Sequence, residues 1–129
     1  MRVEARGRFA ATVLALAVAA CAHAPLRAPG AEGRVEVGIA SYYARSFQGH
    51  RTASGTRYDG RSMTCAHRFH PFGTSLRVTD LDTGRSVVVK VTDRGPISRG
   101  RIIDLSFAAA RALGIVERGI ARVRVELAL

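Results

Sequence analysis

The chain has 129 residues, of which 47% are hydrophobic, 23% charged and 6% aromatic, with 13 Gly, 4 Pro, 2 Cys and no Trp. This composition fits one modest globular domain and excludes a collagen, a coiled coil and a disordered tail. Lys and Arg number 20 against 10 Asp and Glu, and the formal net charge of +10, carried by arginine everywhere except at Lys90, indicates an anionic or polar partner.

The first 20 residues have the features of a secretory signal. The start is basic, with arginines at Arg2, Arg6 and Arg8. The uncharged run from Phe9 to Ala20 is shorter than the ~20 apolar residues of a membrane-spanning helix. Small residues lead into Cys21, which resembles the bacterial lipobox, where cleavage precedes a cysteine that becomes acylated. Ordinary signal cleavage with an incidental Cys21 is the alternative.

The lipobox resemblance implies three segments: residues 1–20 as the signal peptide, residues 21–35 as the lipidated Cys21 and a short tether, and residues 36–129 as the domain. It implies fatty acyl chains, palmitate among them, on Cys21 and, because Ala22 follows, an outer-membrane lipoprotein that faces the periplasm. Loss of residues 1–20 leaves 17 cations against 9 anions, a net charge of +8. Since the chain leaves the cytoplasm, we expect no nucleic-acid partner, and cell-wall polymer and anionic lipid remain.

Alternation from Val35 to Tyr43, with apolar side chains at the odd positions through Ile39, predicts a half-buried strand. Residues 44–62 are polar and carry several Gly and Asp breakers, which predicts a long functional loop. A β-hairpin is predicted over the segments Leu76–Leu81 and Ser86–Val91.

Arg101–Leu105 predicts another strand, which leads directly into a helix with Ser106 as its N-cap and Gly114 as a left-handed stop. Alternation over Ile120–Leu127 predicts a last strand with its odd positions inward. In total the sequence predicts five or six strands and one helix in a single domain. Closure removes exposed strand edges, so short strands with many turns favour a small closed barrel.

Three ordered stretches go beyond such patterns. They are Gly38–Tyr43 before Thr52–Gly55, then Thr64–His67 with Pro71–Thr74, then Asp93–Pro96 leading to Arg101–Ser106. Their order and spacing resemble rare lipoprotein A, a family similar to endolytic lytic transglycosylases of peptidoglycan and related to expansins. The resemblance covers about residues 38–114 and implies a mainly β fold, a small six-stranded double-psi β-barrel with one short helix.

The resemblance also implies cleavage of peptidoglycan glycan strands to 1,6-anhydromuramyl ends, with no cofactor. Breaking a glycosidic bond needs an acid, and because the muramic acid's own 6-hydroxyl attacks its anomeric carbon, one carboxyl can donate a proton and take one back. Asp104 and Asp93 are the candidates. A helix-capping carboxylate is the alternative role for Asp104 and an Asx-type turn that for Asp93. Since a nearby arginine favours the ionised carboxylate, the acid should be the aspartate with fewer arginine contacts.

Arg94 is expected to hold one of these carboxylates, or a carboxyl of the substrate, in a bidentate pair. His67 is the third position that the family resemblance marks as catalytic, where it would support an aspartate or the sugar; a core histidine is the alternative. Tyr42 and Tyr43 offer flat faces for sugar rings. Because strand neighbours face opposite ways, one tyrosine should lie in the groove and the other in the packing.

A metal site is not expected. The histidines that could ligate an ion, His50, His67 and His70, have no carboxylate or thiolate in a recognisable ligand spacing around them.

The sequence departs from the family in the long loop. Family members read Ala-Asn-Gly-Glu or Ala-Ser-Gly-Glu there, whereas Ala53–Thr56 ends in threonine, which cannot donate a proton near neutral pH. Asp59 matches the family's downstream aspartate, so Thr56 and Asp59 remain expected substrate contacts. The missing glutamate gives an alternative function, a non-catalytic peptidoglycan-binding lipoprotein. The carboxy-terminal SPOR domain of many family members has no residues left to form it here, so septal targeting is not assumed.

Overall fold

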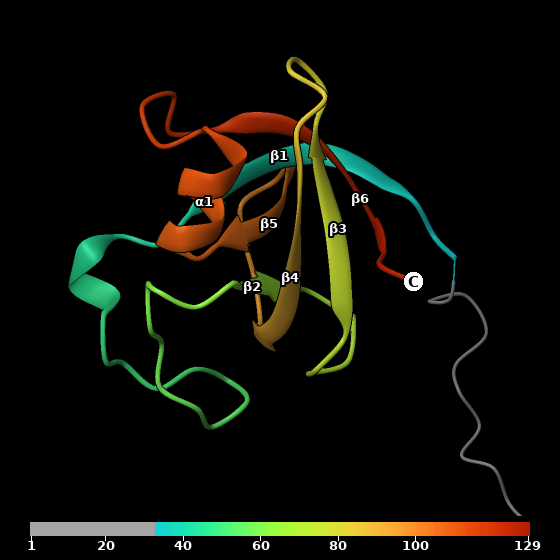
Figure 1. Cartoon of the computed structure of the whole chain (residues 1–129). Coiled ribbons are helices and arrows are strands. Elements are labelled where there is room, and N and C mark those ends of the chain that lie inside the picture. Colours follow the sequence, from blue (N-terminus) through green and yellow to red (C-terminus); the bar gives the residue numbers. More distant parts are fainter. Residues whose placement is uncertain (1–32) are drawn as a thin grey trace, which may run out of the picture.

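The computed structural model describes residues 33–129, so the predicted signal peptide, Cys21 and most of the predicted tether lie outside the described residues. The strands and helix in chain order are β1 (Glu36–Tyr42), β2 (Thr64–His67), β3 (Ser75–Asp80), β4 (Ser86–Asp93), β5 (Arg101–Leu105), α1 (Phe107–Leu113) and β6 (Ala121–Leu127). The six strands close into a barrel in the order β1-β5-β2-β4-β3-β6 (Figure 1). Over residues 33–129 no helix has the length and apolar character that crossing a membrane requires.

The barrel is mixed. β1 pairs with β5 and β2 pairs with β4 in parallel, and the other four neighbouring pairs are antiparallel. The structure thus confirms the predicted small closed barrel with one short helix. Closure pairs both edges of every strand, which leaves no open sheet edge for another chain to join.

Alternating side chains fill the barrel. β4 buries Val87, Val89 and Val91 while its other positions face outward, and β6 buries its odd positions, as predicted. α1 covers one side of the barrel (Figure 1) and contributes buried alanine and leucine side chains to the same core. Its predicted caps are confirmed: Ser106 Oγ accepts a hydrogen bond from the backbone N–H of Ala109, and Gly114 has φ +82°.

The inward face predicted for β1, with its apolar odd positions buried, is wrong. Val37 is 52% exposed, whereas Ala40 is fully buried. The even positions face inward because Glu36 contacts His67 inside the barrel, and because a side chain at Gly38 would place its Cβ 2.7 Å from Ile102 Cγ2. β2 was expected only as a motif, since four residues are too few to show a period.

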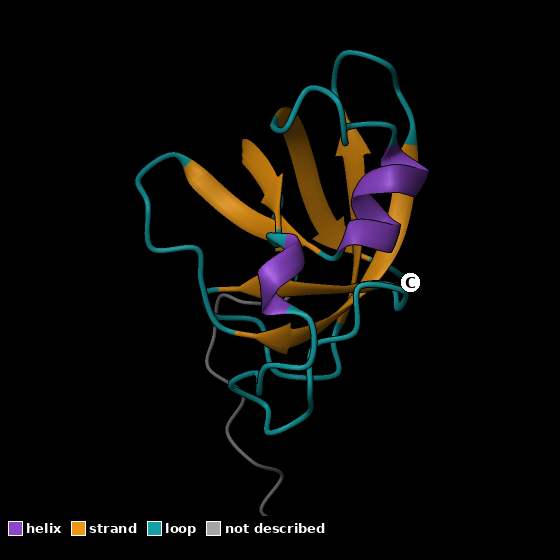
Figure 2. Cartoon of the chain, turned by 90° about the vertical axis from the view of Figure 1, so that its left-hand side faces the viewer, coloured by secondary structure: helices purple, strands orange, loops and turns teal. Residues whose placement is uncertain are grey.

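The long loop between β1 and β2 packs on the side that carries α1 (Figure 2). It contains a short 3₁₀ turn, Arg45–Phe47. Two hydrogen bonds fasten it to the start of the helix: Ala108 N–H donates to the Gly60 carbonyl at 2.8 Å, and Phe107 N–H donates to Tyr58 Oη at 3.1 Å. These hydrogen bonds hold the long loop against the start of α1, beside the barrel.

Candidate functional site

A row of aligned residues crosses four neighbouring strands of the barrel. Ser41 on β1 is paired with Asp104 on β5, Asp104 with Ala66 on β2, and Ala66 with Asp93 on β4. Residues paired in register face the same side of a sheet, so both aspartates share the outer face of the barrel. With strands ~4.8 Å apart, roughly 10 Å separate their Cα atoms. The two predicted carboxylates are thus brought to one face, on either side of a small side chain.

Asp104 is held through one carboxylate oxygen. Oδ1 accepts hydrogen bonds from Ser41 Oγ and from Arg101 Nη2, and the side chain is 16% exposed. No hydrogen bond within the described residues reaches Oδ2. Asp104 therefore has a fixed orientation and a second oxygen that forms no hydrogen bond with the described residues.

Asp93 is hydrogen-bonded through both oxygens. Oδ1 accepts from the backbone N–H groups of Ala53 (2.8 Å) and Arg94 (2.9 Å), and Oδ2 accepts from Tyr43 Oη (2.7 Å). The bond from Ala53 ties the tip of the long loop to the end of β4. The local bond to Asp93 comes from the next residue, Arg94, and not from the residue two positions on, so the described residues do not show the Asx-type turn that was its alternative role. No guanidinium within residues 33–129 contacts Asp93.

The two tyrosines make different contacts, but both line one hollow between the long loop and α1, so they do not divide between groove and packing as expected. Tyr42 packs against the core, and its hydroxyl donates to the Val116 carbonyl. Tyr43 lies at the row, where its ring stacks on Phe47 with centroids 5.0 Å apart. Burial, and after it the hydrogen bond and charge of Asp93, raise the pKa of Tyr43 far above its ordinary value. Tyr43 thus stays a hydrogen-bond donor to Asp93 at every physiological pH.

The Arg94 guanidinium does not hold either aspartate, so of its two expected roles only contact with a carboxyl of the substrate stays a prediction. Nη1 donates to the backbone carbonyls of His67 (3.2 Å) and His70 (2.9 Å), and the group lies 4.0 Å from the ring centroid of Phe72. After β4 the chain turns away from the row, so the Arg94 guanidinium binds the backbone of the segment that follows β2. The arginine that reaches the row is Arg101, three residues before Asp104.

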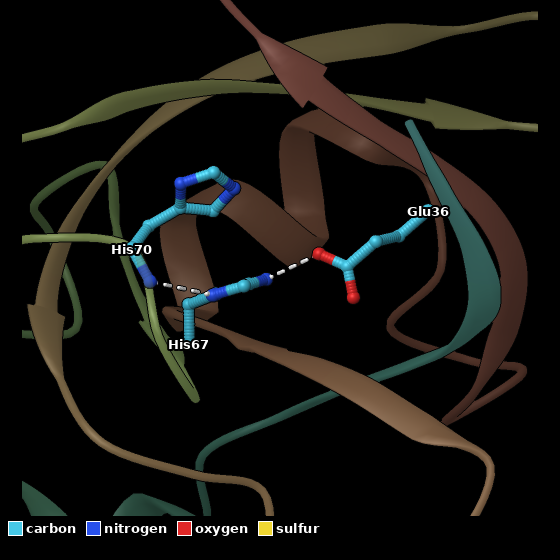
Figure 3. A group of neighbouring side chains, drawn as sticks. All are labelled: Glu36, His67 and His70. Carbon is cyan, nitrogen blue, oxygen red and sulfur yellow. Dashed lines mark hydrogen bonds and ion pairs between the residues drawn. The ribbon is translucent and has the colours of Figure 1, made fainter. Parts of the chain in front are cut away.

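His67 is not brought to the aspartates either. Its register partner Ile103 belongs to the core, so its side chain faces the barrel interior, opposite to Ala66. There Nε2 lies 2.8 Å from Glu36 Oε1, and His70 packs against the ring (Figure 3). Burial is the main cause that lowers the pKa of both histidines, against the opposing effect of Glu36. His67 is therefore a core histidine, which was the alternative to its catalytic role.

Glu36, His67 and His70 form the group that could hold a metal ion, with potential ligand atoms all within 4.8 Å of one another (Figure 3). The spacing of residues in the sequence did not reveal this group, because Glu36 is 31 residues from His67. The protonation pattern does not suit an ion. His67 Nδ1 accepts the backbone N–H groups of Phe69 and His70, which leaves the ring proton on Nε2, where it is donated to Glu36. A ligating imidazole needs the reverse, a bare nitrogen toward the metal and an N–H donated outward.

Thr56 and Asp59 lie in the long loop, outside the row. They line a hollow of about 440 Å³ together with residues that include Met63 and Lys90. The Thr56 hydroxyl lies within hydrogen-bond distance of the hydroxyls of Thr52 and Ser54. Asp59 accepts from the backbone and side chain of Arg61, which lowers the pKa of its carboxyl.

Two residues of the row were not anticipated. Ser41 reaches Asp104 across 63 residues of sequence, through a strand pairing that no local pattern encodes. Arg101 was one of many arginines in the sequence. Its position three residues before Asp104 was the available signal, and its Nε is buried without a partner in the described part of the chain.

Comparison with known proteins gives a consistent result. The family model described as lytic transglycolase matches residues 35–125. The chain is 55% identical over 92 residues to a probable endolytic peptidoglycan transglycosylase RlpA of Nostoc sp., and 54% identical over 90 residues to the endolytic peptidoglycan transglycosylase RlpA of Pseudomonas aeruginosa. Each alignment covers 70% of this chain, but 25% and 26% of the relatives. The chain thus spans about a quarter of the length of these curated relatives.

Solved structures share the barrel. The Streptomyces papain inhibitor is 27% identical with a TM-score of 0.61, and the alignment covers 77% of this chain and 98% of the inhibitor. The apo Clavibacter michiganensis expansin is 28% identical with a TM-score of 0.57, with 74% of this chain and 51% of the expansin covered.

Proposed function

The chain belongs to the lytic transglycolase family, with the double-psi β-barrel predicted from its sequence, and on this premise we propose that it cleaves the glycan strands of peptidoglycan. The relatives named as endolytic peptidoglycan transglycosylases support the substrate class. The observation that carries the proposal is the outer row, in which Asp93 and Asp104 flank Ala66 on one face.

The contacts of the two carboxylates suggest a division of roles. Asp93 touches no guanidinium in the described residues, but both of its oxygens accept hydrogen bonds from N–H or O–H groups, whereas Asp104 Oδ2 accepts none from them. In the proposed reaction Asp104 Oδ2 donates a proton to the leaving glycosidic oxygen while the bond to the anomeric carbon breaks, and Asp93 holds the long loop beside the row. The 6-hydroxyl of the same muramic acid attacks that carbon, and Asp104 Oδ2 accepts the hydroxyl proton. The product is a 1,6-anhydromuramyl end with no water consumed.

The test is product analysis with peptide-stripped glycan as substrate. Asp104→Asn and Asp93→Asn should each lower the rate of anhydromuramyl release by about 100-fold or more, the usual contribution of acid–base catalysis. Asp82→Asn, in the exposed turn between β3 and β4, is the matched control and should retain full activity. Wild-type protein that releases no anhydromuramyl product over a long digestion would refute cleavage.

A second function, glycan binding without cleavage, is favoured by Thr56. The Thr56 hydroxyl lies within hydrogen-bond distance of the hydroxyls of Thr52 and Ser54. The family that the sequence resembles has a glutamate at this position, and a threonine supplies no acid in its place. In this case the protein should sediment with insoluble peptidoglycan without cutting it. Sedimentation should weaken as salt screens the arginine charges.

Membrane attachment through Cys21 is part of the proposal. The run of small residues before Cys21 supports acylation, and Ala22 after it supports an outer-membrane, periplasm-facing location. Labelling cells with a palmitate analogue should mark the chain, and Cys21→Ser should remove the label. Retained label in Cys21→Ser would show that Cys21 is not the anchor.

A further inference from the structure

One end of the barrel is made by two loops and by the first described residues. The strand pairings place the start of β1, the end of β2, the start of β3, the end of β4 and the start of β5 together at this end. β6 and the chain also end here, beside the start of β1 (Figure 1). Residues 33–35, the loop 68–74 and the loop 94–100 therefore form one face of the molecule, the basal face.

The basal face is preformed, because arginines fasten its two loops to each other. Arg68 donates to the backbone carbonyls of Pro96 (2.6 Å) and Ser98 (2.8 Å). Arg94 donates in the opposite direction, to the carbonyl of His70 at 2.9 Å. A surface whose backbone is already held in this way loses little conformational freedom when it binds a partner.

Large apolar side chains project from both loops of the basal face. Ile97 is 96% exposed, and Phe69 and Phe72 are 40% and 42% exposed. Val35, at the start of the described chain, is exposed as well. Because covering exposed apolar surface is favourable, a group of such side chains on one face indicates a docking surface.

The basal face is also cationic. Its three segments carry no acidic residue and four arginines, namely Arg34, Arg68, Arg94 and Arg99. The guanidinium carbon of Arg34 lies 5.7 Å from the centre of the Phe69 ring, and that of Arg94 lies 4.0 Å from the centre of the Phe72 ring. A sugar stacks on the flat face of an aromatic ring, and each of these rings already has an arginine over it. Cations mixed with phenylalanine and a branched aliphatic side chain match the interfacial zone of an anionic bilayer.

The position of the basal face in the chain points to the same partner. Residues 22–33 separate Arg34 from Cys21, the proposed lipid anchor, and even a fully extended chain of this length spans only roughly 45 Å. An acylated Cys21 therefore holds the basal face close to a bilayer. Such a short tether gives an effective concentration in the millimolar range, so a weak affinity for the lipid surface is sufficient for docking.

We propose that the basal face docks on the bilayer that holds the lipid anchor, with Phe69, Phe72 and Ile97 in the interfacial zone and the arginines at anionic phospholipid headgroups. The inference rests on the proposed function for the presence of a membrane beside the chain. The long loop follows the end of β1 and α1 follows the end of β5, and both of these strand ends lie at the opposite end of the barrel. Docking therefore directs the long loop and α1 away from the membrane.

The test is flotation with lipid vesicles, and the protein is residues 21–129 with Cys21→Ser. This chain contains all the described residues and has neither the signal peptide nor an acyl chain. It should bind vesicles of equal parts phosphatidylglycerol and phosphatidylcholine about tenfold or more tightly than vesicles of phosphatidylcholine alone. Ile97→Ser should weaken binding to the anionic vesicles about threefold to tenfold, because one aliphatic side chain no longer enters the bilayer. Arg34→Gln and Arg99→Gln should each weaken it about fivefold.

Ile120→Ser and Arg85→Gln are the matched controls. Both residues are exposed and lie at the opposite end of the barrel, Ile120 before β6 and Arg85 before β4. Both variants should bind the vesicles as the parent chain does. Equal losses in the controls would mean adsorption through overall charge and hydrophobicity and would overturn the assignment, and so would a parent chain that does not bind the anionic vesicles.

Two further assays separate this inference from the proposed function. A chain that cleaves stripped glycan in solution and does not bind vesicles has the activity without the docking surface. A chain that binds vesicles through Ile97 and Arg34 but releases no anhydromuramyl product, or takes up no palmitate label, has the docking surface without the activity or the anchor. Weaker sedimentation of Ile97→Ser with insoluble peptidoglycan, together with unchanged vesicle binding, would assign the basal face to glycan instead and refute the inference.

Discussion

Individual side chains of this protein acquire their chemistry from pairings that span long stretches of sequence. Asp104 is fixed by Ser41 and Arg101, and Asp93 by Tyr43 and the backbone of the long loop. The buried Ala66 lies between the two aspartates, on the strand that pairs with both of theirs. The residue that departs from the family, Thr56, lies in the loop that Asp93 anchors.

Thr56→Glu tests whether the threonine limits cleavage. Thr56 is exposed and borders an open hollow, so a glutamate fits without repacking the core. Restoring a carboxylate should raise anhydromuramyl release from stripped glycan by about tenfold or more, within the range of one acid–base group. Thr83→Glu, in the exposed turn before β4, should leave the rate unchanged. An unchanged rate in Thr56→Glu would show that this position does not limit the reaction.

The buried histidines should make the fold sensitive to mild acid. Burial lowers the pKa of His67 and His70 below their ordinary value of 6.5; Glu36 opposes this shift, and Arg94, together with Arg68 at His67, adds to it. The unfolded chain therefore takes up these protons at a higher pH than the folded chain. The contribution of the two neutral histidines to the free energy of unfolding is fully present above about pH 6.5. It falls as the pH drops below this value, by up to ~1.4 kcal/mol per pH unit for each histidine.

The measurement is the urea midpoint at pH 7.5 and at pH 5.5. It should be lower at pH 5.5 in the wild type and in His50→Gln, since His50 is exposed on the loop. His70→Gln should show a smaller difference between the two pH values. A midpoint that stays constant or rises on acidification would contradict the buried, neutral histidines.

At the scale of secondary structure, the start of α1 joins the helix to β2. Ser106 is fully buried, and its Oγ accepts hydrogen bonds from the backbone N–H of Ala109 (3.2 Å) and of Thr64 (3.3 Å). The same hydroxyl thus caps the helix and holds the first residue of β2. This dual contact positions α1 against the long loop, and with it the groove between them.

Ser106→Ala should destabilise the fold by about 1–2 kcal/mol, because it removes a helix cap and leaves the buried N–H of Ala109 without its acceptor, whereas the Thr64 N–H keeps the Ser62 carbonyl. The free energy of unfolding in urea is the measurement. Ser98→Ala, on the exposed segment before β5, should change it by less than ~0.5 kcal/mol. Equal losses in the two variants would show that the Ser106 hydroxyl contributes little.

At the scale of the whole molecule, closure of the barrel protects its interior. Cys65 is fully buried among the core residues. Burial, and after it the charge of Asp104, raise the pKa of the thiol to about 12. The reactive thiolate is therefore scarce in the folded protein, and reagents reach Cys65 only when strands separate.

Cys21→Ser leaves Cys65 as the only cysteine of the sequence and allows a direct measurement. A soluble disulfide reagent at neutral pH should label the native protein about 1,000-fold more slowly than the urea-unfolded protein, since labelling has to await global opening. The labelling rate should follow the unfolded fraction as urea increases. Fast labelling without urea would indicate local opening of β2.

The sequence by itself determined the strands with a clear period, the two caps of α1 and the family. Ala121, Val123 and Val125 alternate with Arg122 and Arg124, which local sterics and burial convert directly into a strand. Ser106 and Gly114 act within one helical turn, so their roles are readable without the fold. The motifs likewise marked Asp93 and Asp104 before their positions were known.

Only the tertiary structure decided how these residues combine. Closing the barrel set the register that places Asp93 and Asp104 on the outer face and turns His67 to the inner face, toward Glu36. It also brought Arg101, and not Arg94, to the row. The physical reason is that strand register is fixed by pairings between residues tens of positions apart, and a shift of one residue would exchange every inward side chain for an outward one.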